Sequence, residues 1–245
     1  MWSEKDPKLS GVEEYLEGIV ALLRERLGGD LLSVALIGGA GAGSFEPASS
    51  DIDVAVVVAR APAPEHLPGL AGELSHSRRP VPARRLELVV YSRERDVLLN
   101  LNSGDEVERA ETSIDPAERF WFVLDVAIAR GRSRTLFGEQ LGAVLSEPPP
   151  DEVRAAALDS LRWFAREEPG APDTLLNACR TWRWALEGEW STKEEAADWA
   201  ISRSSDPGPI SAALAARKLG RREGLDRDAV RRVAAKAEEA LLSSA

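Results

Sequence analysis

The chain has 245 residues, of which 44% are hydrophobic and 29% are charged, and its formal net charge is −10. This length fits one large or two small globular domains, and no apolar run is long enough to span a bilayer. The acidic balance argues against nucleic-acid binding, which usually needs a basic face. Short basic pairs such as Arg84-Arg85 are expected to be solvated strand ends. An acidic surface weakly favours a small cationic partner, although plain solubility is the better explanation of the charge.

The N-terminus is too polar for a signal peptide, and the single Cys179 cannot form an internal disulfide. Both features are typical of a cytoplasmic protein. We therefore expect a cytoplasmic monomer with a small-molecule substrate and with neither a nucleic acid nor a membrane as partner.

The first part of the chain alternates between helix and strand patterns. Ser10 and Glu13 have the spacing of a capping box, and the apolar end of residues 51–58 indicates a central strand covered on both faces. The predicted elements are helices over 10–27, 63–77, 117–130 and 139–145, strands over 31–37, 51–58, 84–91 and 97–101, and a tight glycine loop over 38–44.

Pro148-Pro149-Pro150 stiffens the backbone, so we place a domain boundary there, between domains 1–148 and 151–245. The second domain is predicted to be all helical, over 152–167, 174–187, 193–202, 210–218 and 227–242. The fold class is therefore α/β with a mixed sheet, followed by an all-α bundle. Five of the seven tryptophans lie in the second part and are expected to anchor its core, namely Trp163, Trp182, Trp184, Trp190 and Trp199.

Asp51 and Asp53 are the candidate metal ligands. Asp is disfavoured in strands, and side chains two residues apart on a strand point to the same face. Two adjacent carboxylates repel unless a cation lies between them, and magnesium suits such a pair because it also binds substrate phosphates. A solvated strand end is the alternative, and it is the commoner explanation for an isolated Asp-x-Asp.

Two neighbouring features favour the metal site. Glu87 is a lone acid in an apolar strand, and beside the Asp strand it would serve as a third metal ligand or as the general base for an attacking hydroxyl. The glycine-rich loop with Gly38, Gly39 and Ser44 offers backbone N–H groups for phosphate. A helix does not follow this loop, so it does not fit a dinucleotide-binding motif.

The order of strand, glycine loop, Asp-x-Asp strand and acid-bearing strand resembles the nucleotidyltransferase superfamily that includes DNA polymerase beta. The resemblance implies a polymerase-beta-like N-terminal domain. It also implies transfer of a nucleotidyl group from a triphosphate to a hydroxyl.

The second domain resembles the C-terminal domain of the aminoglycoside adenylyltransferases that modify streptomycin and spectinomycin. The matching segments are Arg180-Thr181-Trp182, Gly188, Lys193 and Ala196-Ala197-Asp198-Trp199-Ala200, together with the helix 122–130 and residues 135–138. The resemblance runs from the glycine loop to about Gly220.

This resemblance implies an ATP-dependent O-adenylyltransferase that acts on a cationic antibiotic and confers resistance to it, with Mg²⁺ and ATP in the site. Asp51 and Asp53 would bind metal, and Glu87 would act as the base. Ser50 would contact phosphate, as would Arg180 and Lys193 from the second domain.

The chain departs from the family in three places. The loop serine is replaced by Gly39 or Ala40, where Ser44 would substitute. The drug-stacking tryptophan has no counterpart near residues 99–104, and the acidic pair that grips the drug has only Glu167, Glu168 and Asp173 nearby. Two alternatives therefore stay open: a protein-modifying adenylyltransferase and a non-catalytic relative that binds nucleotide or drug.

Overall fold

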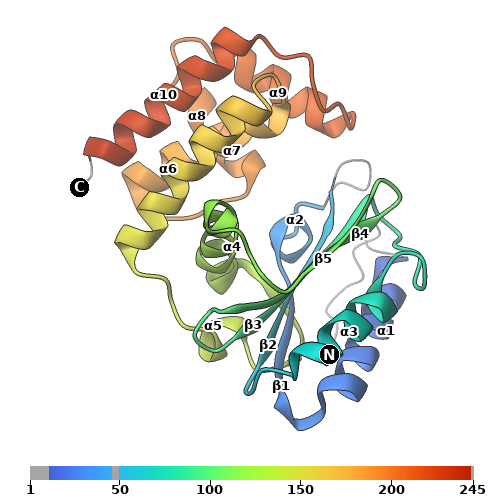
Figure 1. The fold of residues 1–245 in the computed structure, drawn as a ribbon. Coiled ribbons are helices and arrows are strands. Elements are labelled where there is room, and N and C mark those ends of the chain that lie inside the picture. Colours follow the sequence, from blue (N-terminus) through green and yellow to red (C-terminus); the bar gives the residue numbers. More distant parts are fainter. Residues whose placement is uncertain (1–10, 46–49, 244–245) are drawn as a thin grey trace. The chain divides into compact units, whose positions relative to one another are not determined.

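The computed structural model describes residues 11–45 and 50–243, and the chain forms two compact units, Met1–Glu147 and Pro148–Ala245. The predicted fold class is confirmed, because a mixed six-stranded sheet is followed by a helical region (Figure 1). Ser10 of the predicted capping box lies outside the described residues. Among the described residues, no helix is long and apolar enough to cross a membrane.

The first unit combines six strands with short and long helices. Its strands are β1 (Leu31–Leu36), β2 (Ile52–Val58), β3 (Arg85–Ser92), β4 (Val97–Gly104), β5 (Val107–Glu111) and β6 (Arg134–Gly138). Its α-helices are α1 (Val12–Leu27), α2 (Gly38–Gly41), α3 (Leu67–Leu74), α4 (Arg119–Arg132) and α5 (Leu141–Val144). Its 3-10 turns are η2 (Gly28–Asp30), η3 (Pro64–His66) and η4 (Pro116–Glu118).

The sheet has the order β5-β4-β3-β2-β1-β6, and the central pair β2 and β3 is parallel while the other pairs are antiparallel. The apolar run Val54–Val58 is buried on both faces, as the sequence predicts for a central strand. Helices α1 and α3 cover one face of the sheet and α4 and α5 the other (Figure 1). The acidic end of β2 therefore belongs to a sheet that is packed on both faces.

The sequence pattern misses three elements of this unit. It does not predict β5 or β6, and it assigns the glycine segment to a loop although that segment forms the one-turn helix α2. Backbone N–H groups of Gly41 and Ala42 donate to the carbonyls of Ile37 and Gly38, which gives the segment its helical hydrogen bonds despite its glycines.

The second unit is an all-helical bundle, as predicted. Its helices are α6 (Pro150–Glu167), α7 (Pro172–Glu187), α8 (Lys193–Ile201), α9 (Gly208–Lys218) and α10 (Arg227–Ser243). Helix α7 is central, since it packs against each of the other four, and it ends at Gly188 in the left-handed conformation, which glycine adopts without strain.

None of the five tryptophans of the second unit is fully buried, although most of the area of each is covered. All five are half-buried, whereas the buried positions are filled by small and aliphatic residues such as Ala178, Ala197 and Leu176. Four of the indoles meet in two pairs. Trp184 stacks on Trp190 with ring centroids 4.9 Å apart, and Trp182 meets Trp199 edge-on at 5.0 Å.

Candidate active site

Three carboxylates from β2 and β3 meet at one end of the parallel pair. Asp51 lies just before the first residue of β2, and Asp53 lies within the strand. The strand register pairs Asp53 with Glu87 of β3. All three side chains are half-buried, and carboxylate oxygens from the three residues lie within 4.8 Å of one another. Such a set of hard oxygen donors fits a magnesium ion.

Glu87 has the most perturbed environment of the three acids. Burial in the sheet face raises the pKa of its carboxyl, and the guanidinium of Arg85 opposes that rise. The negative charge of Asp51 raises the pKa further. A carboxylate with a raised pKa binds a proton more tightly, which suits a general base.

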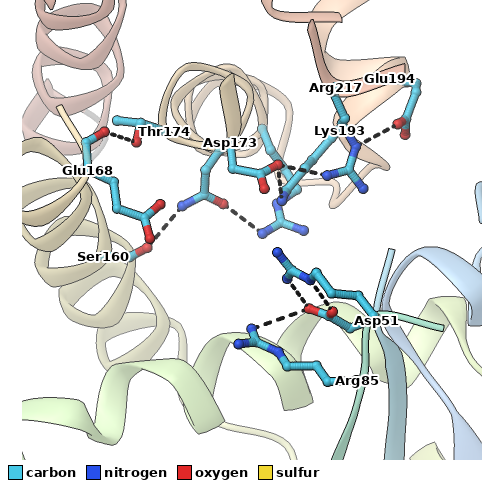
Figure 2. Close-up of polar contacts among 12 residues, drawn as sticks. Asp51, Arg85, Ser160, Glu168, Asp173, Thr174, Lys193, Glu194 and Arg217 are labelled. Atoms are coloured by element: carbon cyan, nitrogen blue, oxygen red, sulfur yellow. Dashed lines mark hydrogen bonds and ion pairs between the residues drawn. The ribbon is translucent and has the colours of Figure 1, made fainter. Parts of the chain in front are cut away.

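Arg84 and Arg85 contact these acids, so the prediction that this pair is a solvated strand end is wrong. Arg84 Nε donates to Asp51 Oδ1 at 2.6 Å, and the same guanidinium forms a second hydrogen bond to Oδ2. Arg85 lies 3.3 Å from Asp51 Oδ2 and also pairs with Glu87. Figure 2 shows Asp51 held by both guanidinium groups. A metal ion that binds Asp51 would share this carboxylate with them or replace them.

The glycine segment packs directly on Asp53. Gly38 has φ +59°, and a Cβ added there would lie 1.8 Å from Asp53 Oδ2, so only glycine fits. A Cβ at Gly39 would lie 3.6 Å from Ser44 Oγ and 3.7 Å from Ser50 Oγ. The predicted loop residues and Ser50 therefore lie together beside the acids.

In the second unit, Arg180 is held by buried neighbours. Its Nη2 donates to Asn177 Oδ1 at 2.7 Å, and Asn177 Nδ2 in turn donates to Ser160 Oγ at 3.0 Å. Asn177 and Ser160 are both buried. Because this chain of hydrogen bonds links α6 to α7, it fixes the direction of the guanidinium.

Lys193 is the first residue of α8, which begins with a capping box between Thr192 and Glu195. Its Nζ donates to Asp173 Oδ1 at 2.7 Å, and Arg217 Nη1 donates to the same oxygen at 2.7 Å (Figure 2). Burial lowers the pKa of Lys193, and the nearby charges of Arg217 and Arg180 lower it further while Asp173 opposes them. Arg180, Lys193 and Arg217 thus form a cation cluster. The sequence analysis names Arg180 and Lys193 but not Arg217.

Asp173 was a candidate for gripping a cationic drug, but in this structure it accepts hydrogen bonds from two cations of its own unit. Cys179 is fully buried, and burial raises the pKa of its thiol to about 12, as expected for a small core residue rather than a nucleophile.

The sequence of the second unit matches the family model described as aminoglycoside adenylyltransferase, C-terminal domain, over residues 143–241. The chain is also 29% identical over 198 residues to spectinomycin 9-adenylyltransferases of Staphylococcus aureus, including those of strains N315 and Mu50. The alignment covers 74% of this chain and 74% of each relative. Residues 143–241 thus match the C-terminal domain of aminoglycoside adenylyltransferases, and most of the chain is similar to spectinomycin 9-adenylyltransferases.

The chain shares its fold with a solved structure. A spectinomycin adenyltransferase from Enterococcus faecialis, crystallised with ATP and spectinomycin, matches the chain with a TM-score of 0.66 and 17% sequence identity. The match covers 94% of this chain and 99% of that chain. At this level of identity the likeness is one of fold.

The predicted residues of the adenylyltransferase site thus form two groups, one in each unit. Asp51, Asp53 and Glu87 lie together with the glycine segment and Ser50 in the first unit. Arg180 and Lys193 lie together in the second unit. Their individual roles stay predictions.

Proposed function

We propose that the protein transfers AMP from ATP to a hydroxyl group of a small cationic antibiotic of the aminoglycoside or spectinomycin class. The three-carboxylate cluster at the ends of β2 and β3 carries this proposal. The curated relatives are named as spectinomycin 9-adenylyltransferases, which supports the acceptor class. Because adenylylation changes the drug, this activity would give resistance to it.

In the proposed reaction, the acceptor oxygen attacks the α-phosphorus of ATP. A new oxygen–phosphorus bond forms as the bond from the α-phosphorus to the bridging oxygen breaks, and pyrophosphate leaves. Glu87 takes the proton of the attacking hydroxyl. Its raised pKa favours this role, since a base works best when its pKa approaches the operating pH.

Asp51 and Asp53 would hold Mg²⁺, with Glu87 beside them. A bound metal supplies charge stabilisation to the phosphoryl oxygens that become more negative in the transition state. Ser50, Ser44 and the N–H groups of the segment around Gly38 and Gly39 would hydrogen-bond the phosphates, because such concave backbone segments bind anions well.

Arg180 and Lys193 would add positive charge around the triphosphate. Lys193 is held near two like charges by Asp173, and a phosphate oxygen would relieve the repulsion among these cations. We therefore expect Lys193→Ala to weaken ATP binding by about 1–3 kcal/mol, the range of a charged hydrogen bond. Calorimetric titration with MgATP measures this. Arg231→Ala, which removes a more exposed cation of the same unit, is the control, and equal losses in both variants would contradict a specific role for Lys193.

Gly38 is expected to be required for the geometry of the site. In Gly38→Ala the new Cβ would push the Asp53 carboxylate aside, so MgATP affinity should fall about tenfold or more, as when a metal ligand loses its support. Gly43→Ala is the matched control, because Gly43 also has a positive φ, +76°, but a Cβ there meets nothing within 4 Å. Backbone strain alone should lower its free energy of unfolding by about 1–2 kcal/mol and leave MgATP affinity unchanged. Parental MgATP affinity in Gly38→Ala would contradict the proposed contact.

A thermal-unfolding screen of aminoglycosides and spectinomycin, each with and without MgATP, tests the proposed function. A ligand that binds only the folded state raises the unfolding temperature by mass action. We expect MgATP and at least one drug to raise it. If a drug stabilises the protein but no pyrophosphate is released, the result favours a non-catalytic relative that binds nucleotide or drug. If proteins are modified instead of drugs, the result favours a protein-modifying adenylyltransferase.

A further inference from the structure

Two consecutive arginines, Arg84 and Arg85, lie against the acid cluster at the ends of β2 and β3. Arg84 Nε donates to Asp51 Oδ1 at 2.6 Å, and Nη2 of the same guanidinium donates to Oδ2. Arg85 Nη2 lies 3.3 Å from Asp51 Oδ2 (Figure 2) and also pairs with Glu87. An ionised carboxylate offers about four lone-pair sites, so these three nitrogens take most of the hydrogen-bonding capacity of Asp51.

The strand register explains why the arginines and the acids meet here. Asp51 immediately precedes Ile52, and Arg85 immediately precedes Leu86, and the register of the parallel strands β2 and β3 pairs Ile52 with Leu86. Arg85 and Glu87 are two residues apart on β3 and therefore share one face of the sheet. The sheet itself thus brings the arginines to the acids.

Burial separates these ion pairs from exposed ones in the same unit. The side chains of Arg84 and Asp51 are 28% and 12% exposed. Arg26 makes the same two-bond contact with Glu73, at 2.8 Å and 2.7 Å, but those side chains are 46% and 42% exposed. Water and salt screen an exposed pair, so it contributes little. The pairs at Asp51 are screened less, and they compete more strongly with any other cation for this carboxylate.

A free Mg²⁺ ion and MgATP meet opposite electrostatic conditions at this cluster. The free ion brings positive charge toward two guanidinium groups and needs carboxylate oxygens that they already contact. MgATP has a net negative charge, because the triphosphate carries more charge than the metal, so the arginines attract the complex as a whole. Magnesium also tends to share its coordination between carboxylates and substrate phosphates. The two arginines therefore oppose binding of the free ion but not binding of the complex.

We propose that Arg84 and Arg85 are positioning residues that keep free divalent cations from the acid cluster, so that the metal binds there together with the triphosphate. This inference rests on the proposed function, since it concerns the metal and the nucleotide of that reaction. Binding of metal and nucleotide is then cooperative, and each ligand raises the affinity for the other by the same factor.

Calorimetric titration with Mn²⁺ in place of Mg²⁺ tests this role without any reaction. Arg84→Met keeps an apolar stem and removes the charge. We expect the affinity for Mn²⁺ alone to rise about 10- to 100-fold, the range for a charge-assisted hydrogen bond, because the ion no longer competes with this guanidinium. The affinity for the Mn²⁺ complex of a non-hydrolysable ATP analogue should not rise, since the arginine does not oppose the complex.

Arg26→Met is the matched control, because it removes an exposed arginine with the same two-bond geometry, and it should leave both affinities unchanged. Arg85→Met should act in the same direction as Arg84→Met, and it decides the question if the latter variant is poorly folded. Parental affinity for Mn²⁺ alone in the folded arginine variants, with the analogue complex still bound, would overturn the inference and leave the proposed function standing. A parent protein that binds Mn²⁺ neither alone nor with the analogue would contradict the proposed metal-dependent reaction, and the inference with it.

Discussion

Replacing Glu87 with glutamine is expected to slow AMP transfer by about 10²–10⁴-fold, the usual cost of removing a positioned general base. Glutamine keeps the shape of the side chain but cannot take the proton of the acceptor hydroxyl. Binding of MgATP should stay nearly parental, because Asp51 and Asp53 are intact. The same carboxylate would also hold a cationic amine of the acceptor, so the affinity for a cationic drug is expected to fall as well.

The measurement is AMP transfer by parent and variant side by side, at saturating drug and MgATP. Glu94→Gln, an exposed glutamate in the turn that joins β3 to β4, controls for loss of an acidic group from the same unit. A Glu87→Gln variant that transfers AMP at the parental rate would remove Glu87 from the mechanism and make Asp53 the next candidate base.

Replacing both Asp51 and Asp53 with asparagine is expected to abolish magnesium-dependent ATP binding while the fold is retained. The two carboxylates provide most of the charge that would hold the metal. The change also removes the charge of one ion-pair partner of Arg84. The remaining affinity for ATP should therefore not depend on magnesium.

Calorimetric titration with ATP in magnesium and in a chelator separates these two contributions. The double variant should show the same affinity in both buffers, whereas the parent should bind more tightly in magnesium. Asp96→Asn, in the turn that follows β3, should behave like the parent. If the double variant binds MgATP as tightly as the parent, the metal site is assigned to the wrong residues.

Much of the fold follows from residue patterns. The valine run of β2 predicts a central strand, and the apolar run of β3 predicts its neighbour, so the approach of Glu87 to the Asp pair is accessible from the sequence. The edge strand β5 (Val107–Glu111) cannot be predicted from the sequence pattern in this way. Four of its five residues are charged or small, as is usual for exposed edges. The last three residues of β4 are also not predicted, since the predicted strand ends at residue 101 and β4 ends at Gly104.

Contacts between side chains far apart in the chain account for the rest of the site. Nothing near Arg84 in the sequence indicates that it pairs with Asp51, 33 residues away. Similarly, Arg217 and Lys193 both donate to Asp173 on a third helix, and Arg217 also pairs with Glu194 of α8. The half-burial of the tryptophans has a general cause, since a large aromatic side chain is seldom fully buried even when most of its area is covered.

The most direct test of the central claim is the mass of the drug after incubation with the protein, ATP and Mg²⁺. Spectinomycin and streptomycin are each supplied, and the product is analysed by mass spectrometry together with released pyrophosphate. We predict that at least one drug gains a single adenylyl group, with one pyrophosphate released for each, and that the gain disappears in the Glu87→Gln protein and without Mg²⁺. Unmodified drugs beside intact ATP, with a protein shown to be folded, would contradict the account.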